Sequence, residues 1–396
     1  MIYLDNAATT YPKPPSVQNA VASALHRFGA NPGRGGHAMS MATAEEVYRT
    51  RCAVSDFFHA PGPECVAFTM NCTHALNAVL KGLLRPGDHV VVSCLEHNAV
   101  MRPLHKLEQC GVTVTQARVV PGDNDATVDA FRRAMRENTR LVVCTHVSNV
   151  WGIRLPVARI AAMAHLYGVP VCVDAAQSAG ILPVFLEEDG VDYLCAAPHK
   201  GLYAPMGTGL LVTARGGELD TILEGGTGTN SVSLDQPEEM PERLESGTIN
   251  VPGIAGLRAG LAFVRQKGME RILRHEVNVM RQIYRALHRT EGVELFTGEP
   301  DGETFAPVVS FRVRGDASEQ TAAALTAQGV AVRAGLHCAP SAHAFMGTLE
   351  SGAVRVCPSA FTTGRDVQGF VTALRQAVRN SQAVHKECRF VKQIGQ

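Results

Sequence analysis

Short apolar runs that alternate with amphipathic stretches constrain the fold of this chain more than any other feature of its sequence. Runs typical of β-strands recur at residues 66–69, 90–93, 112–117, 141–145, 169–174, 193–196 and 209–212. Amphipathic stretches at 98–109, 128–137 and 157–167 lie between them. Several runs, such as HVVVSC and VPVCVD, are apolar on both faces, as in a sheet that helices cover on both sides. The alternation predicts an α/β domain with a mainly parallel sheet.

At 396 residues the chain is longer than a domain with a single hydrophobic core usually is, so we expect two domains. The alternation of strands and helices also changes after about residue 250. A long helical stretch at 254–287 leads into a strand at 308–313, a helix at 318–328, strands at 330–335 and 354–357 and a closing helix near 366–379. These elements predict a smaller α+β domain, against which we expect the N-terminal segment to pack. We place a large domain at 16–264 and a small domain at 265–396 together with 1–15.

The composition argues against several classes of protein. The 37 Lys and Arg residues balance the 37 Asp and Glu residues, so no basic excess suggests nucleic acid as a partner. No apolar run approaches the ~18 residues of a membrane span, and MIYLDNAATT does not resemble a signal peptide. The eleven cysteines include no C-x-x-C pair, which argues against a disulfide framework or a zinc site. We therefore expect a cytoplasmic protein without a membrane segment or a metal centre.

Two polar residues follow buried strands, at the sheet edge where ligands bind in parallel sheets. Lys200 lies in AAPHKGLYAPMGTG, and Asp174 ends VPVCVD. Each alone has a simpler explanation, because Lys200 suits an exposed turn and Asp174 suits the cap of the next helix. A partly desolvated amine, however, loses its proton more readily and can form an imine. Together the two residues match pyridoxal phosphate, which needs an imine-forming lysine and a carboxylate against its ring nitrogen.

The carboxylate has a clear electrostatic role in such a site. At about 4 Å from the ring nitrogen and an effective dielectric near 20, it contributes roughly 4 kcal/mol. That energy corresponds to about three pK units for the ring nitrogen. The ring then stays protonated and withdraws electrons, which an asparagine in place of Asp174 would not achieve.

Eight segments along the chain resemble the class V aminotransferases of the cysteine desulfurase group. They are YLDNAAT, NPGRGGH, SNVWG, VDAAQS, PHKGLYAPMGTG, LESGTIN, RAGLHCAP and VRVCPSAF, and they extend from about residue 3 to 365. A single segment such as DAAQ is moderately specific, whereas eight in the family's order are highly specific. The resemblance implies the pyridoxal-phosphate-dependent transferase fold type I, with a mainly parallel sheet in a large domain and a smaller α+β C-terminal domain.

The resemblance also implies which residues bind the cofactor ring. Lys200 binds the cofactor covalently and later moves protons at the substrate Cα atom, and Asp174 pairs with the ring nitrogen. Gln177 reaches the ring hydroxyl, and His97 is a catalytic residue that stacks on the ring. Taken alone, His97 would be read as a surface loop histidine.

Three further residues are implied as phosphate contacts. Thr73 opens a helix, where backbone N–H groups and the helix dipole suit an anion, and His199 also contacts phosphate. Thr248 in LESGTIN occupies the position that family members donate across a homodimer interface, although alone it would be an ordinary loop threonine.

The substrate and the nucleophile are implied by residues from the second half of the sequence. The implied substrate-binding residues are Asn149, Arg333 and Arg355, and Asn149 is also implied to contact the cofactor. An arginine suits this role because its guanidinium group can hold a carboxylate through two hydrogen bonds. Cys338 lies between Gly335 and Pro340, next to His337 and five positions after Arg333, in a loop where neighbouring positive charge would favour a thiolate.

Cys338 determines the reaction that the resemblance implies. Most free cysteines are inert core residues, but cysteine desulfurases carry their nucleophile at this position. The implied reaction converts L-cysteine to L-alanine and leaves a persulfide on Cys338 for a sulfur-acceptor protein. The alternatives are selenocysteine lyase or another class V aminotransferase reaction, since a transaminase does not need Cys338. A pyridoxal-phosphate-binding regulator is a more distant alternative, and a nucleotide-binding enzyme is disfavoured because TMNCTHALN lacks G-x-G-x-x-G.

Three positions depart from the family pattern. Ala197 stands where relatives often carry a hydroxyl residue. Thr362 stands where they often carry an asparagine, and Gly33 where they often carry a histidine. The spacing of 17 positions between Cys338 and Arg355 (355 − 338) resembles that of desulfurases with a short cysteine loop, whose turnover depends on a dedicated acceptor protein.

Overall fold

A computed structural model describes residues 1–33 and 35–394, with side chains up to residue 382. The chain divides into two compact units. We call Pro12–Val147 together with Leu155–Glu270 the large unit, and Met1–Tyr11, Ser148–Arg154 and Arg271–Gln396 the small unit. The sequence analysis did not anticipate that Ser148–Arg154 would belong to the small unit.

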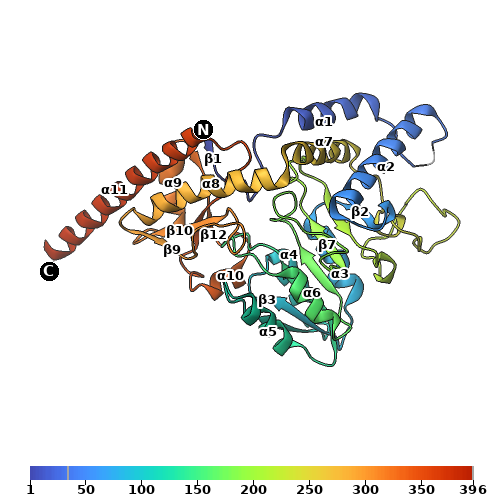
Figure 1. The fold of residues 1–396 in the computed structure, drawn as a ribbon, viewed down its shortest axis with the longest axis horizontal. Helices are drawn as coiled ribbons and strands as arrows, with labels where there is room; N and C mark the ends of the chain where they lie inside the picture. Colours follow the sequence, from blue (N-terminus) through green and yellow to red (C-terminus); the bar gives the residue numbers. More distant parts are fainter. Residues whose placement is uncertain (34, 395–396) are drawn as a thin grey trace. The chain divides into compact units, whose positions relative to one another are not determined.

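A seven-stranded sheet forms the centre of the large unit (Figure 1). Its strands are β2 (Val66–Thr69), β3 (His89–Ser93), β4 (Thr113–Ala117), β5 (Thr139–Thr145), β6 (Val171–Asp174), β7 (Tyr193–Ala196) and β8 (Gly209–Val212). The strand order is β2-β8-β7-β6-β5-β3-β4, and β8 runs antiparallel to β2 and β7 while the other neighbouring strands are parallel. The prediction of a mainly parallel sheet is confirmed, with every expected strand present.

The strands are buried because their apolar side chains point to both faces of the sheet. Every residue of β3, β6, β7 and β8 is buried, whereas the edge strand β4 exposes Thr113 and Gln116. On one face, Val90 and Val92 share a core with Leu76 and Leu104 from the helices that follow β2 and β3.

The large unit also contains helices and short 3-10 turns. The helices are α1 (Pro15–Arg27), α2 (Ala38–Phe58), α3 (Cys72–Leu83), α4 (Asn98–Glu108), α5 (Asn124–Ala134), α6 (Val157–His165) and α7 (Val251–Lys267). The 3-10 turns lie at Pro63–Cys65, Gly216–Glu218 and Glu242–Leu244. Helix α7 lies beside α1 (Figure 1). Helix α5 begins before the predicted start at 128, because the Asp123 side chain accepts a hydrogen bond from the Ala126 N–H at 2.9 Å.

The small unit contains a four-stranded antiparallel sheet and a separate strand pair. The sheet has the order β12 (Arg333–Gly335), β13 (Ala353–Val356), β10 (Val309–Val313) and β9 (Val293–Leu295), and β1 (Ile2–Tyr3) runs parallel to β11 (Val330–Ala331). Helices α8 (Met269–His288), α9 (Ser318–Thr326), α10 (Pro340–Phe345) and α11 (Gly364–Ile394) accompany them. Leu4, Ile283, Phe311 and Phe370 share the core of this unit.

Two predicted elements are divided in the structure. The helical stretch expected at 254–287 is two helices, α7 and α8, separated at Gly268, whose φ of 82° suits glycine. The strand expected at 330–335 is β11 and β12, which belong to different sheets. Within the described part of the chain, no helix is both long and apolar enough to span a membrane.

Candidate cofactor and substrate site

Asp174 and Lys200 lie at the carboxyl ends of neighbouring strands in the large unit. Asp174 is the last residue of β6 and pairs in register with Cys195 of β7. Lys200 lies in the turn after β7, where its N–H donates to the Ala197 carbonyl at 3.1 Å and its own carbonyl accepts from the Tyr203 N–H at 2.9 Å. Parallel packing of two apolar strands thus brings the predicted lysine and carboxylate to the same edge of the sheet.

Asp174 is buried, with 4% of its surface exposed. Its Oδ1 accepts a hydrogen bond from the Ala176 N–H at 2.9 Å and lies 3.7 Å from the Cys72 Sγ atom. The residues after Asp174, including the half-buried Gln177, form turns rather than an α-helix, so Asp174 is not a helix cap. A buried carboxylate at a strand end requires a cationic or hydrogen-bonding partner, and a protonated ring nitrogen meets that requirement.

His97 is the N-cap of α4. Its Nδ1 accepts a hydrogen bond from the Ala99 N–H at 3.0 Å, which fixes the orientation of the half-buried ring just beyond β3. This placement agrees with a ring that stacks on a planar ligand and disfavours a freely moving loop histidine.

The neighbouring Glu96 is a buried acid that the sequence analysis missed. Its Oε1 accepts hydrogen bonds from the Thr145 N–H at 2.8 Å and from the Ser93 hydroxyl, and so it links the ends of β5 and β3. Complete burial raises the pKa of Glu96 to about 8, and the charge of Asp174 acts in the same direction. Glu96 is therefore mainly protonated at pH 7. An acidic residue three positions after a buried strand was the signal available in the sequence.

The phosphate candidates Thr73 and His199 also belong to the large unit. Thr73 is exposed in the first turn of α3, whose N-cap residue Asn71 accepts a hydrogen bond from the His74 N–H at 2.9 Å. Gly209 allows β8 to pass this helix start, since a Cβ atom there would lie 2.2 Å from the Asn71 carbonyl carbon. The structure thus provides the helix N-terminus on which the phosphate prediction depends.

His199 precedes Lys200 and is uncharged at neutral pH. Burial, together with the positive charges of Lys200 and Lys13, lowers the pKa of His199 to about 4. The Lys13 ammonium group donates a hydrogen bond to the His199 carbonyl at 2.6 Å. A neutral imidazole can still donate one hydrogen bond to a phosphate.

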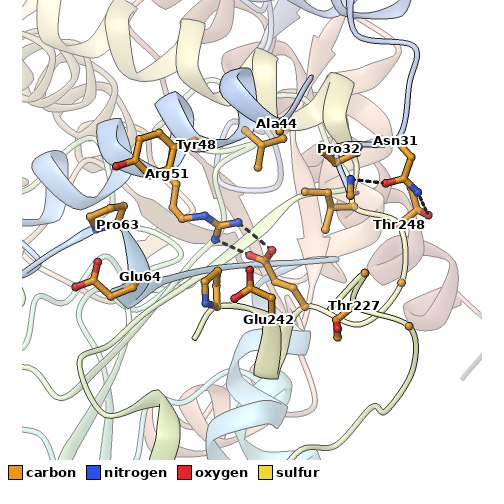
Figure 2. Close-up of a pocket in the computed structure, with 18 residues that line it drawn as sticks. Asn31, Pro32, Ala44, Tyr48, Arg51, Pro63, Glu64, Thr227, Glu242 and Thr248 are labelled. Carbon is orange, nitrogen blue, oxygen red and sulfur yellow. Dashed lines mark hydrogen bonds and ion pairs between the residues drawn. The ribbon is translucent and has the colours of Figure 1, made fainter. Parts of the chain in front are cut away.

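Thr248 lies at a cavity of about 680 Å³ in the large unit (Figure 2). Asn31 donates a hydrogen bond to the Thr248 hydroxyl at 3.5 Å, and a bidentate ion pair joins Arg51 to Glu245 at 2.7 and 2.9 Å. The described residues that line this cavity do not include Asp174, Lys200 or His97. The structure therefore does not bring Thr248 together with the other cofactor candidates at this cavity.

The predicted substrate residues lie together in the small unit. Arg333 and Arg355 are register partners in β12 and β13. Arg355 donates hydrogen bonds to the Asn149 carbonyl at 2.9 Å and to Asp5 Oδ1 at 3.0 Å, and Arg333 lies 3.2 Å from Asp5 Oδ2. Asp5, which the sequence analysis did not assign, offsets the repulsion between the two guanidinium groups.

Two polar atoms in this cluster suit a bound polar ligand. Within the described part of the chain, Arg355 Nε and Asn149 Oδ1 are buried without a hydrogen-bond partner. Leaving a buried polar group unsatisfied costs about 1–3 kcal/mol. A substrate or cofactor that satisfies these atoms would recover that free energy, in agreement with the predicted roles of both residues.

A buried tryptophan holds the segment that carries Asn149. Trp151 is fully buried and donates a hydrogen bond from Nε1 to the Ala342 carbonyl at 2.9 Å. Gly152 has a φ of 66°, and a Cβ atom there would lie 2.4 Å from the Val308 carbonyl oxygen. The SNVWG segment therefore needs both its tryptophan and its glycine to place Asn149.

Cys338 is exposed in the loop after β12. Both His337 (φ 50°) and Cys338 (φ 56°) adopt the left-handed conformation, which is uncommon for residues other than glycine. Hydrogen bonds hold the loop from within the unit, because the His337 carbonyl accepts from Asn149 Nδ2 at 2.8 Å and His337 Nε2 donates to the Ala353 carbonyl at 3.0 Å.

The expectation that His337 contributes positive charge near the thiol is wrong. His337 is 8% exposed. Burial lowers its pKa to about 3, and the charge of Arg355 acts in the same direction. The imidazole is therefore neutral at physiological pH.

The three departures from the family pattern have different surroundings. Ala197 is buried at the end of β7 and accepts the hydrogen bond from the Lys200 N–H. Thr362 is buried in the small unit, where its hydroxyl accepts from the Ser359 N–H at 2.9 Å. Gly33 lines the same cavity as Thr248.

The chain belongs to the class-V aminotransferase family, whose family model matches residues 2–370. It is 34% identical over 376 residues to a probable cysteine desulfurase of Methanothermobacter thermautotrophicus, with 93% of this chain and 92% of the relative covered. It is 31% identical over 395 residues to a cysteine desulfurase of Escherichia coli O157:H7, with 96% and 94% covered.

Solved structures give a similar result. The apo structure of a cysteine desulfurase from Thermococcus onnurineus matches with a TM-score of 0.89 at 30% identity, covering 96% of this chain and 95% of that one. The cysteine desulfurase CsdA from Escherichia coli matches with a TM-score of 0.85 at 27% identity, covering 96% and 94%. These matches confirm the family and the fold type I that the sequence predicted.

Proposed function

We propose that this chain is a pyridoxal-phosphate-dependent cysteine desulfurase that converts L-cysteine to L-alanine and carries the released sulfur as a persulfide on Cys338. The observation that carries this proposal is the exposed Cys338, held in a left-handed loop by the same Asn149 whose backbone carbonyl contacts Arg355. A transaminase has no need for such a thiol, and the names of the relatives do not favour selenocysteine lyase or another class V reaction.

The large unit supplies the proposed cofactor residues. When bound, pyridoxal phosphate supplies the electron sink for negative charge that develops at the substrate Cα atom. Lys200 holds the cofactor and moves a proton to and from Cα, while the buried Asp174 carboxylate keeps the ring nitrogen protonated. His97 stacks on the ring and Gln177 contacts its hydroxyl.

Phosphate binding completes the proposed cofactor site. Thr73, at the start of α3, and the neutral His199 donate hydrogen bonds to the phosphate. Thr248 contributes from a second copy of the chain, so we propose a homodimer. We also propose that residues 16–264 and residues 265–396 with 1–15 act as the large and small domains.

The small unit supplies the proposed substrate residues. Arg355 holds the L-cysteine carboxylate and its buried Nε gains a partner, while Asn149 Oδ1 accepts a hydrogen bond from the bound cofactor or substrate. Arg333 adds positive charge from the neighbouring strand. Asp5 keeps both guanidinium groups in place before the substrate arrives.

Sulfur transfer follows from the position of Cys338. Its thiolate attacks the substrate sulfur atom, so that a sulfur–sulfur bond forms as the bond between Cβ and sulfur breaks. The electron pair of the broken bond passes to the substrate carbon, which gains a proton and leaves as L-alanine. The persulfide on Cys338 is then available to a sulfur-acceptor protein, and we propose that the reaction takes place in the cytoplasm.

The test is to incubate the purified holoenzyme with L-cysteine and to measure alanine together with protein-bound sulfur by mass spectrometry. Wild-type protein should gain one sulfur atom at Cys338, and Cys338→Ala should lose alanine production while it still binds pyridoxal phosphate. Cys110, another exposed cysteine, offers a matched control, and Cys110→Ala should behave as wild type. If Cys338→Ala releases alanine at the wild-type rate, Cys338 is not the nucleophile and the proposal fails.

A further inference from the structure

A second lysine of the large unit reaches the turn that carries Lys200. The Lys13 Nζ atom lies 2.6 Å from the carbonyl oxygen of His199, the residue directly before Lys200. This carbonyl belongs to the peptide group whose nitrogen is that of Lys200. Lys13 therefore contacts the peptide group that joins His199 to Lys200, from a position 186 residues before His199 in the sequence.

The backbone of Lys13 is itself held firmly. Proline residues precede and follow it in YPKPP, and Pro15 begins α1. The Gln18 side chain of this helix donates a hydrogen bond to the Lys13 carbonyl at 2.9 Å. Because proline fixes φ, this arrangement limits the movement of the lysine backbone.

The Lys200 turn also packs closely against α7. Gly260 of α7 lies so near the Leu202 carbonyl that a Cβ atom there would be 2.1 Å from its oxygen. Gly256, one turn earlier, packs against both Pro205 and Val21 of α1, which a Cβ atom would approach to 2.7 and 2.9 Å. The turn that carries Lys200 therefore contacts both α7 and Lys13.

Lys13 and Lys200 both act electrostatically on His199, the residue whose carbonyl Lys13 contacts. Burial and these two charges lower the pKa of His199 to about 4, so its imidazole is neutral at pH 7. The His199 backbone therefore lies between a neutral side chain and the Lys13 hydrogen bond.

We propose that Lys13 is a positioning residue of the cofactor site, which holds the Lys200 turn through the His199 carbonyl. This inference rests on the proposed role of Lys200 as the cofactor lysine. Burial lowers the pKa of Lys13 to about 8, so its ammonium group is mainly protonated at pH 7 and can donate this hydrogen bond.

The test compares three substitutions in the full-length protein. Lys13→Met removes the charge and the hydrogen bond, Lys13→Gln keeps a donor for the His199 carbonyl without the charge, and Lys13→Arg keeps both. Lys81→Met, at an exposed position in the last turn of α3, is the matched control. Circular dichroism establishes that each variant is folded.

The measurement is the rate at which the apoprotein takes up pyridoxal phosphate. This rate should fall several-fold in Lys13→Met and stay at the wild-type value in Lys81→Met. It should be restored in Lys13→Arg and Lys13→Gln, which both keep a donor for the His199 carbonyl. Rescue by Lys13→Gln separates the effect of the hydrogen bond from that of the charge.

Each other result counts against the inference. An unchanged uptake rate in a folded Lys13→Met variant overturns it, and so does a Lys13→Gln variant that is as slow as Lys13→Met. Borohydride reduction of the wild-type holoenzyme should attach the cofactor to Lys200. If the label appears elsewhere, the proposed function fails together with this inference; if it appears on Lys200 while Lys13→Met matches wild type in uptake rate, only the inference fails.

Discussion

Replacing Glu96 with glutamine should make the stability of the large unit less dependent on pH. Glu96 is fully buried, and its Oε1 accepts hydrogen bonds from the Thr145 N–H and the Ser93 hydroxyl. Glutamine has the same shape, can accept the same hydrogen bonds and cannot ionise. Any difference in pH dependence between the two proteins therefore reports the ionisation of Glu96.

The magnitude follows from the pKa of Glu96, which burial raises from 4.5 to about 8. Between these values the folded state binds more protons than the unfolded state, so the free energy of unfolding falls as the pH rises. The stabilisation is fully present below pH 4.5 and is lost progressively up to about pH 8. At about 1.4 kcal/mol per pH unit, wild type should lose roughly 3 to 4 kcal/mol relative to Glu96→Gln between pH 5 and pH 8.

The assay is urea denaturation of both proteins at pH 5, 6, 7 and 8, followed by circular dichroism. Groups that titrate equally in the two proteins cancel in the comparison, so only the difference between the curves is interpreted. The dependence of the unfolding free energy on urea concentration should be the same for both proteins, since a changed slope would indicate a changed unfolded or native state.

Two parallel stability curves would refute this reasoning, because Glu96 would then titrate alike in the folded and unfolded states. Glu45→Gln is the control, since the Glu45 side chain is 55% exposed and its ion-pair partner is an arginine, a residue type that stays charged over this pH range. Its curve should run parallel to that of wild type over the whole range. A pH-dependent difference in this variant would indicate that the effect is not specific to the buried carboxyl.

Two further predictions concern the proposed cofactor site. Asp174→Asn should keep the fold but slow proton exchange at the substrate Cα by roughly three orders of magnitude. Hydrogen–deuterium exchange of the substrate, measured by NMR, checks this rate. Turnover near the wild-type rate would mean that the carboxylate is not needed. Mixing inactive Lys200→Ala with a Thr248→Ala variant should raise the activity above that of the two proteins measured separately if each site uses residues from two copies. A fully active monomer in sedimentation would contradict the homodimer.

The strands were predictable because a strand that is buried on both faces consists mainly of consecutive apolar residues, which are visible in the sequence. Element ends were less predictable, because side chains and single backbone conformations determine them. The Asp123 side chain starts α5 earlier than its apolar pattern suggests. Gly268 interrupts a helical pattern that continues on both sides of it, since a positive φ cannot be read from amphipathicity.

The site residues were predictable where they follow apolar strands in recognisable segments, as Asp174 and Lys200 do. The missed residues act through contacts between distant positions. Asp5 meets Arg355 across 350 positions of sequence, and Lys13 meets the carbonyl of His199 across 186. Such contacts depend on the folded arrangement, and neither spacing nor residue type in a local window indicates them.

The Cys338 loop shows why residue types near a nucleophile do not establish its electrostatic surroundings. His337 is adjacent to the thiol in sequence, but the fold buries its ring and lowers its pKa to about 3. Its contribution is therefore conformational. Two successive left-handed residues cost about 1–3 kcal/mol each, and the hydrogen bonds of His337 to Asn149 and Ala353 offset part of that cost. Because the buried His337 and the exposed Cys338 share this strained turn, the direction of the thiol depends on the packing of its neutral neighbour.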